Sequence, residues 1–130
     1  MGEKSNKINS YIAGLVNSYL LKHEEIIHSG LFLVDSLGKD LSVVDWYFNG
    51  YSVISETISS HLQDLCKNKI VEYSDDGLYI LVKNQKRVSG EELFTAKKNL
   101  ERILLKFKDG TQVVKEARKL FSMRKMGTRF

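Results

Sequence analysis

The chain has 130 residues, 42% hydrophobic and 28% charged, which suits one folded domain with a sizeable core. Because it has one cysteine, an internal disulfide is excluded, and the lack of proline argues against an extended linker. The longest apolar run, residues 31–34, is far too short to span a bilayer, and the N-terminal residues lack the apolar core of a signal peptide. We therefore expect a cytoplasmic protein without a membrane anchor.

The net charge of +4 is unevenly distributed along the chain. Residues 1–89 hold 9 Lys and Arg against 11 Asp and Glu, whereas residues 90–130 hold 11 against 5. Lysine and arginine supply much of the affinity of proteins for nucleic-acid phosphates. A nucleic-acid-binding function would therefore need cations from the C-terminal part of the chain.

Two helices are predicted in the N-terminal part, residues 6–37. Apolar residues recur at helical spacing and predict an amphipathic helix over residues 6–22. A second helix is predicted from about residue 23 to 37, with Gly38 ending it. Residues 31–34 could instead form a strand, since short apolar runs are ambiguous.

The central part, residues 41–82, has the order helix, tight turn, helix and β-hairpin. The apolar residues at 43–48 predict a short helix, and the turn at 49–52 would break it, with Gly50 supplying a permissive backbone. A second helix is predicted between residues 53 and 69, capped by Ser52 or Ser55. Its apolar stripe has steps of four, four and three and consists of Ile54, Ile58, Leu62 and Leu65.

A β-hairpin is predicted directly after this helix. Residues 70–73 and 78–82 are strand-like runs, and the Asp76-Gly77 pair between them is a strong hairpin signal. This hairpin would be the wing of a winged helix-turn-helix.

The central part resembles winged-helix transcription regulators, including the MarR-like and ArsR-like groups. The residues that carry the resemblance are Thr57-Ile58-Ser59-Ser60-His61-Leu62, then Leu65, then Lys67-Asn68-Lys69-Ile70-Val71-Glu72. The resemblance covers about the middle third of the chain and implies a recognition helix followed by the first wing strand. Asn68 stands where glycine is usual in this group, although asparagine also tolerates the left-handed conformation. The acidic hairpin tip, Asp75-Asp76, departs from the basic tip usual in the group.

The C-terminal part, residues 91–126, predicts two helices separated by Asp109-Gly110. The first, over residues 91–107, carries an apolar seam with steps of three and four, and the second runs from Thr111 to about residue 126. Because a monomer would expose this seam, we expect a homodimer built by the outer helices. The expected interface residues are Leu15, Tyr19, Leu93, Leu100, Ile103 and Phe107. Alternatively, the seam packs on the chain's own N-terminal helix.

Polar residues on the recognition helix are the candidate base-reading set. Glutamine can pair with adenine through two hydrogen bonds, and glutamate can accept one from cytosine N4. The set consists of Ser55, Glu56, Ser59, Ser60, Gln63 and Lys67. Cationic residues of two further segments are the candidate phosphate contacts. Those of the C-terminal tail can contact phosphates if the tail folds back beside the recognition helix. They are Lys83, Lys86 and Arg87 after the wing, and Arg124, Lys125 and Arg129 in the tail.

Enzymatic chemistry has little support in the sequence. His23 and His28 are five residues apart, which does not place them on one helix face, so we interpret them as surface histidines. Cys66 lacks neighbouring cations that would lower its pKa, and we interpret it, like His61, as a packing residue. The aromatic residues at 46–48 and 51 are expected to fill the core. No cofactor or metal ligand set is predicted.

The predicted fold is mainly α with a small β-hairpin, a winged helix-turn-helix flanked by N- and C-terminal helices within one domain, 1–130. Two functions fit this fold. The first is a regulator that binds double-stranded DNA sequence-specifically, with its recognition helix in the major groove. The second is a protein–protein interaction module in a larger assembly that does not bind DNA directly.

Overall fold

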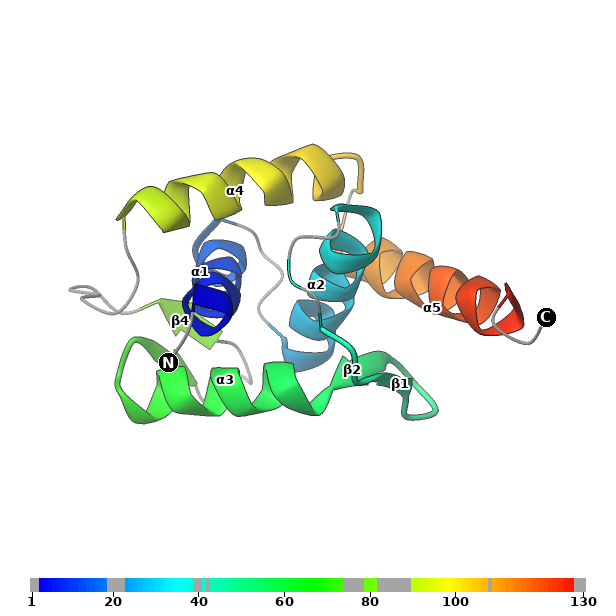
Figure 1. The fold of residues 1–130 in the computed structure, drawn as a ribbon, viewed down its shortest axis with the longest axis horizontal. Helices are drawn as coiled ribbons and strands as arrows, with labels where there is room; N and C mark the ends of the chain where they lie inside the picture. Colours follow the sequence, from blue (N-terminus) through cyan, green and yellow to red (C-terminus); the bar gives the residue numbers. More distant parts are fainter. Residues whose placement is uncertain are drawn as a thin grey trace.

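The fold is mainly helical, with two small sheets (Figure 1). The computed structural model describes residues 3–18, 23–38, 41, 43–73, 79–81, 90–107 and 109–127. Within these ranges the elements are α1 (Glu3–Ser18), α2 (Glu24–Gly38), β1 (Trp46–Phe48), β2 (Val53–Ser55), α3 (Glu56–Lys67), β3 (Val71–Tyr73), β4 (Tyr79–Leu81), α4 (Gly90–Leu104) and α5 (Gly110–Gly127). None of the helices in these ranges combines the length and apolar character that crossing a membrane requires.

The helices α1 and α2 form the centre of the fold. In Figure 1, α4 covers them from one side and α3 from the other, while α5 packs on α2 and extends away from the rest. Gly30 of α2 allows a close approach, since a Cβ atom at this position would lie 2.9 Å from Leu15 Cδ1 of α1. The core is mainly aliphatic and also contains the buried aromatic side chains of Phe32 and Tyr11. Burial of this apolar surface is the main force holding the helices together.

Helical periodicity located most helices correctly. α2 ends at Gly38 as predicted, and the alternative strand at residues 31–34 is wrong. α3 begins after Ser55, whose Oγ accepts a hydrogen bond from Ile58 N at 3.2 Å, so Ser55 caps this helix. At the other end of α3, Lys69 takes the left-handed conformation (φ 61°), and Asn68 does not (φ −91°).

The predicted helix at residues 43–48 is wrong, because these residues lead into a β-hairpin. β1 pairs with β2 in antiparallel register, with Trp46 opposite Ser55 and Phe48 opposite Val53. A hairpin therefore stands where the first helix of the helix-turn-helix was predicted. Aromatic side chains favour strands over helices, which agrees with this outcome.

The turn between β1 and β2 is built on Asn49 and Gly50. Gly50 has φ +102°, a conformation that other residues rarely adopt. Asn49 Oδ1 accepts hydrogen bonds from Tyr51 N at 2.9 Å and Ser52 N at 2.8 Å, and Asn49 N donates to Ser52 O. Asparagine bonds of this kind stabilise a turn locally. Asn49-Gly50 is thus a hairpin turn.

The second hairpin is confirmed. β3 pairs antiparallel with β4, with Val71 opposite Leu81 and Tyr73 opposite Tyr79. The acidic tip, Asp75-Asp76, lies outside the described residues. β3 lies beside α3 and β4 beside α1, so the hairpin closes one end of the bundle.

The apolar seam of α4 is buried inside the chain. Leu100 is fully buried, Ile103 is 8% exposed, and both belong to the same core cluster as Leu15 of α1. Phe107 packs against this cluster from its edge, while the side chains of Leu93 and Tyr19 lie outside the described residues. The intramolecular alternative is therefore the one observed. An exposed seam can no longer be the reason to expect a homodimer.

Candidate functional site

The β1–β2 hairpin is attached to α2 by one buried carboxylate, Asp35. Its Oδ1 accepts a hydrogen bond from Leu41 N, and its Oδ2 accepts from Val43 N and from Trp46 Nε1, each at 3.1 Å. The Trp46 ring also packs edge-on against Phe32, with ring centroids 5.2 Å apart. Hydrogen bonds to a charged acceptor are stronger than neutral ones. The segment leading into β1 is therefore held firmly on α2.

A second aspartate ties the start of β1 to the start of α3. Asp45 accepts hydrogen bonds from Ser55 Oγ at 2.5 Å and from Thr57 N and Thr57 Oγ1 at 3.0 Å. Although partial desolvation acts in the opposite direction, these bonds hold the pKa of Asp45 below its usual value. Asp45 is thus an anion placed at the positive N-terminal end of α3, where it is stabilised.

The hairpin exposes large apolar side chains. Exposed fractions are 92% for Val44, 38% for Tyr47, 46% for Phe48 and 73% for Tyr51. Four of the nine large hydrophobic residues that are exposed in the described part of the chain therefore lie within eight consecutive residues. The expectation that these aromatic residues fill the core holds for Trp46 alone. An exposed cluster of this kind marks an interaction site more often than chance.

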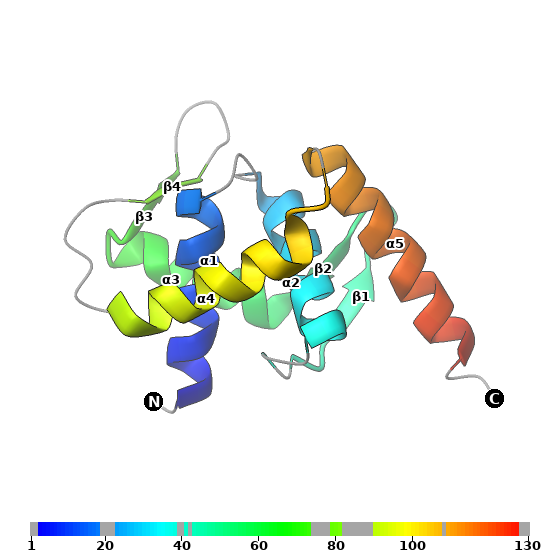
Figure 2. The ribbon, with the colours of Figure 1, turned by 90° about the horizontal axis from the view of Figure 1, so that it is seen from above.

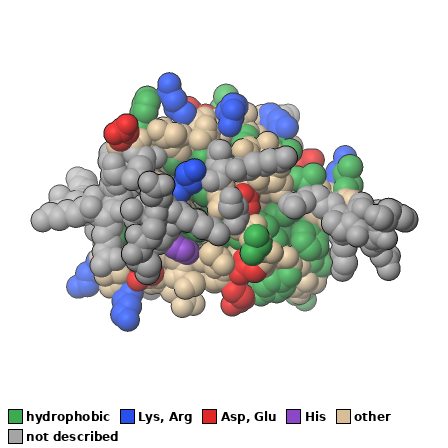
Figure 3. All heavy atoms as spheres, in the orientation of Figure 1, with side chains coloured by type: hydrophobic (Ala, Val, Ile, Leu, Met, Phe, Trp, Pro, Cys, Tyr) green, Lys and Arg blue, Asp and Glu red, His purple; other side chains and the backbone are tan. Residues whose placement is uncertain are grey.

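Acidic side chains lie beside this cluster: Glu56 and Asp45 act on Tyr47, and Glu25 accepts a hydrogen bond from Ser52 Oγ. Residues 23–66 contain seven Asp and Glu and one Lys, a net charge of −6. Glu56, at the start of α3, accepts a hydrogen bond from Tyr47 Oη at 2.7 Å, and this bond raises the pKa of Tyr47. Figure 3 shows acidic and hydrophobic side chains together over the hairpin, at the lower right of that face. The surface around β1 is therefore both aromatic and negatively charged.

His28 lies behind the hairpin and holds it to α2. This histidine is buried, contrary to its interpretation as a surface residue, and its Nδ1 accepts a hydrogen bond from Ser55 N at 3.1 Å. Burial lowers its pKa to about 4, against the opposing effect of the negative charges of Glu56 and Asp45. His28 is therefore a neutral structural residue at neutral pH.

His28 and Ser59 do not form a catalytic dyad, although Ser59 Oγ lies 3.3 Å from His28 Nε2. Because Nδ1 accepts a bond from a backbone N–H, the proton of the neutral ring is on Nε2 and points at Ser59. Activation of a serine requires an unprotonated nitrogen facing the hydroxyl. The arrangement therefore stabilises the packing of α3 on α2.

The structure separates the predicted base-reading residues into two groups. Ser55 is fully buried as the helix cap, and Ser59 is half-buried against His28. Glu56, with its hydrogen bond from Tyr47, lies at the hairpin end of α3. The members of the set that remain exposed to solvent on α3 without such a contact are Ser60, Gln63 and Lys67. Among the described residues, three of the six predicted base-reading residues are thus exposed along α3 without such a contact, where a ligand could contact them.

The basic helix α5 does not lie beside α3. Figures 1 and 2 show α5 at the opposite end of the molecule from α3, with the β1–β2 hairpin between them. Arg118 of α5 donates a hydrogen bond to the carbonyl oxygen of Tyr51 in the hairpin loop. The side chains of Arg124 and Lys125, and the whole of Arg129, Lys83, Lys86 and Arg87, lie outside the described residues. The backbone of α5 thus does not take the position beside α3 that the predicted phosphate contacts of the tail require.

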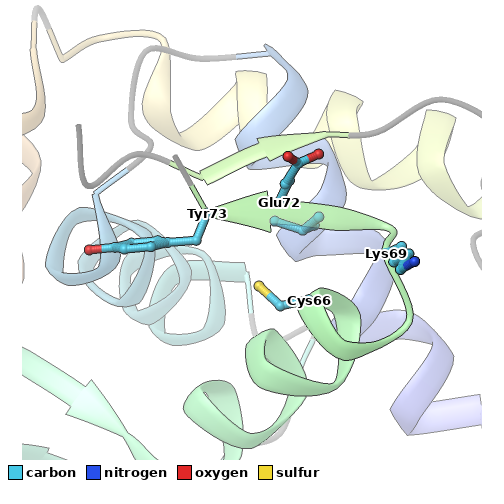
Figure 4. Close-up of a pocket in the computed structure, with 5 residues that line it drawn as sticks. Cys66, Lys69, Glu72 and Tyr73 are labelled. Atoms are coloured by element: carbon cyan, nitrogen blue, oxygen red, sulfur yellow. The ribbon is translucent and has the colours of Figure 1, made fainter. Parts of the chain in front are cut away.

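A shallow hollow of about 420 Å³ lies between the end of α3 and β3. Figure 4 shows its lining, with the Cys66 sulfur directed toward β3 and the Tyr73 ring extending away from it. Burial raises the pKa of the Cys66 thiol, as does the charge of Glu24, so the reactive thiolate is disfavoured. Among the described residues, no group of three or more His, Cys, Asp or Glu could hold a metal ion.

Sequence reasoning missed the hairpin as a site, although two signals were present. Asn49-Gly50 between aromatic runs is a hairpin signal, and the acidic character of residues 23–66 is visible by counting. Comparison of the chain with protein-family models, curated proteins and solved structures finds no match. The function must therefore be argued from this surface.

Proposed function

We propose that this protein is a protein-interaction module that binds its partner through the β1–β2 hairpin. The observation that carries the proposal is the exposure of Tyr47, Phe48 and Tyr51 on one hairpin, with the exposed Val44 two residues before it. Tyrosine and phenylalanine are enriched in protein interfaces, where a few aromatic residues supply most of the binding energy.

The hairpin is also rigid, which favours binding. Asp35 holds β1 to α2, His28 holds β2 to α2, and Asn49 closes the turn between the strands. A surface that is already ordered loses little conformational entropy when a partner docks. Glu56 and Asp45 place negative charge beside the exposed Tyr47 ring, which disfavours nucleic acid as the partner of this surface.

The test is photocrosslinking from position 51 in the cell, followed by reconstitution with the purified partner. Phe48→Ala and Tyr51→Ala should each weaken the reconstituted complex about tenfold or more, as expected for interface anchors. Phe94→Ala and Tyr73→Ala are matched controls, because both rings are 60% exposed elsewhere on the molecule. A partner that binds all four variants equally, or a hairpin that crosslinks to no protein, would contradict the proposal.

A DNA-binding regulator is the second candidate. The exposed row Ser60, Gln63 and Lys67 on α3, followed by the β3–β4 hairpin, favours it. Fluorescence anisotropy with a random duplex pool at low salt tests this function. Binding that falls steeply with salt and is weakened by Gln63→Ala would place DNA binding first. On the protein-interaction proposal, we expect no duplex binding even at low salt.

A further inference from the structure

We propose that the outer edge of β1 binds an extended, basic segment of the partner protein, which adds to the β1–β2 sheet as a third strand. This inference rests on the proposed function, because it specifies what the hairpin binds. Three features of the described residues support it. The outer edge of β1 is free, the opposite edge of the sheet on β2 is closed, and negative charge lies at the open end of the hairpin.

The free edge follows from the alternation of hydrogen bonds in an antiparallel pair. Asn49 N donates to Ser52 O, so Asn49 and Ser52 form a bonded pair, as do Tyr47 and Ile54 two residues further along. The backbone groups of Trp46 and Phe48 therefore point outward, away from β2. Within the described part of the chain, these outward groups have no hydrogen-bond partner. Such groups can pair with an added strand.

The opposite edge of the sheet is closed. Ser55, which lies opposite Trp46, directs its backbone N–H outward from β2, and this group donates to His28 Nδ1. α2 therefore covers the edge of β2 and leaves β1 as the accessible edge. A third strand could be added to this sheet on the β1 side alone.

The charge at the open end of the hairpin selects a basic segment. Asp45 directly precedes β1 and Glu56 directly follows β2, so the two carboxylates flank the open end. Arg118 contacts the carbonyl of Tyr51 at the loop, which is the other end of the strands. Glu56 is exposed and oriented by the Tyr47 hydroxyl, so an arginine can pair with its carboxylate while stacking on the Tyr47 ring.

The experiment is a titration of the full chain with synthetic peptides, followed by amide chemical shifts in NMR. The probe is a peptide of alternating arginine and valine, which has strand propensity and carries its charges on one face. Its controls are the same peptide with glutamate in place of arginine, and the arginine peptide N-methylated at alternate residues. We expect shifts at residues 46–48 with the first peptide and not with either control.

The variant Glu56→Gln keeps an acceptor for the Tyr47 hydroxyl and removes the charge. It should weaken binding of the arginine peptide about two- to fivefold, the range for an exposed ion pair. Glu101→Gln, an exposed glutamate of α4, is the matched control and should have no effect. Equal binding of the glutamate or N-methylated peptide, or no shift in β1, would overturn the inference.

Measurements on the complex with the natural partner distinguish a failure of this inference from a failure of the proposed function. If its complex depends on Phe48 and Tyr51 but is insensitive to both Glu56→Gln and added salt, the proposed function stands and this inference fails. If the complex is insensitive to Phe48 and Tyr51, the proposed function itself fails.

Discussion

The Nδ1 atom of His28 accepts a hydrogen bond from the backbone N–H of Ser55, 27 residues further along the chain, at 3.1 Å. This single contact joins the first half of α2 to the edge of β2 at the residue that caps α3. Because it needs an unprotonated nitrogen, acid should break it.

The stability of the fold should therefore decrease as the pH falls from about 6.5 toward 4. The pKa of His28 is about 4 in the folded protein and 6.5 when unperturbed, so the unfolded state binds more protons over this range. Between pH 7.5 and 5, we expect a loss of about 2 kcal/mol in the free energy of unfolding from this residue. Urea denaturation at both pH values measures it.

His28→Gln should reduce this pH dependence, since glutamine offers an acceptor to Ser55 and does not titrate in this range. His23→Gln is the matched control, because His23 lies at the start of the same helix and is exposed. An equal pH dependence in wild type and His28→Gln would show that His28 is not the responsible group.

Removal of the buried charge of Asp35 should destabilise the protein. Asp35→Asn retains a single side-chain acceptor where three donors converge, so at least one buried donor loses its partner. We expect a loss of about 2–3 kcal/mol in the free energy of unfolding, measured by circular dichroism in urea. Asp64→Asn, on the exposed face of α3, should change it by less than about 0.5 kcal/mol.

Two serines of the predicted base-reading set should differ in their effect on stability. Ser55→Ala removes the cap of α3 and one donor to Asp45, which should cost about 1–2 kcal/mol. Ser60→Ala changes an exposed position in the same helix and should be close to neutral. Thermal denaturation of the two variants makes the comparison, and equal melting temperatures would contradict the capping role of Ser55.

Leu100→Glu should unfold the protein. Leu100 is fully buried between α4 and α1, and burying an unpaired carboxylate there should cost more than about 4 kcal/mol, a large part of the stability of a small domain. Leu105→Glu, at a position that is 74% exposed, should remain folded. Circular dichroism and sedimentation of both variants are the measurements. A folded, monomeric Leu100→Glu protein derived from a dimeric wild type would restore the seam as a subunit interface.

Sequence patterns predicted those features that depend on neighbouring residues. The spacing of Ile58, Leu62 and Leu65 defined α3, and an Asp-Gly pair defined the β3–β4 hairpin. The helix predicted at residues 43–48 is wrong because these residues include aromatic, strand-favouring side chains and are followed by an Asn-Gly turn. Short apolar runs are compatible with either structure.

The remaining features depend on contacts between residues far apart in the chain. Nothing local shows that Asp35 accepts a bond from Trp46, 11 residues away, or that the α4 seam packs on the chain's own α1. An apolar seam predicts that another apolar surface covers it, but it does not show whether that surface belongs to the same chain or to a second one. The burial of His28 had a local signal, because it lies three residues before Leu31 and therefore on the apolar side of α2.

Trp46 is the single tryptophan of the chain, and its indole N–H donates to Asp35 while its ring packs edge-on against Phe32. The tryptophan fluorescence of the protein is therefore emitted from β1 itself. A ligand that docks on β1 should change the emission without any attached dye, whereas one that docks on the exposed face of α4 should leave the spectrum unchanged. The protein thus carries its own optical reporter at the surface that we propose for partner binding.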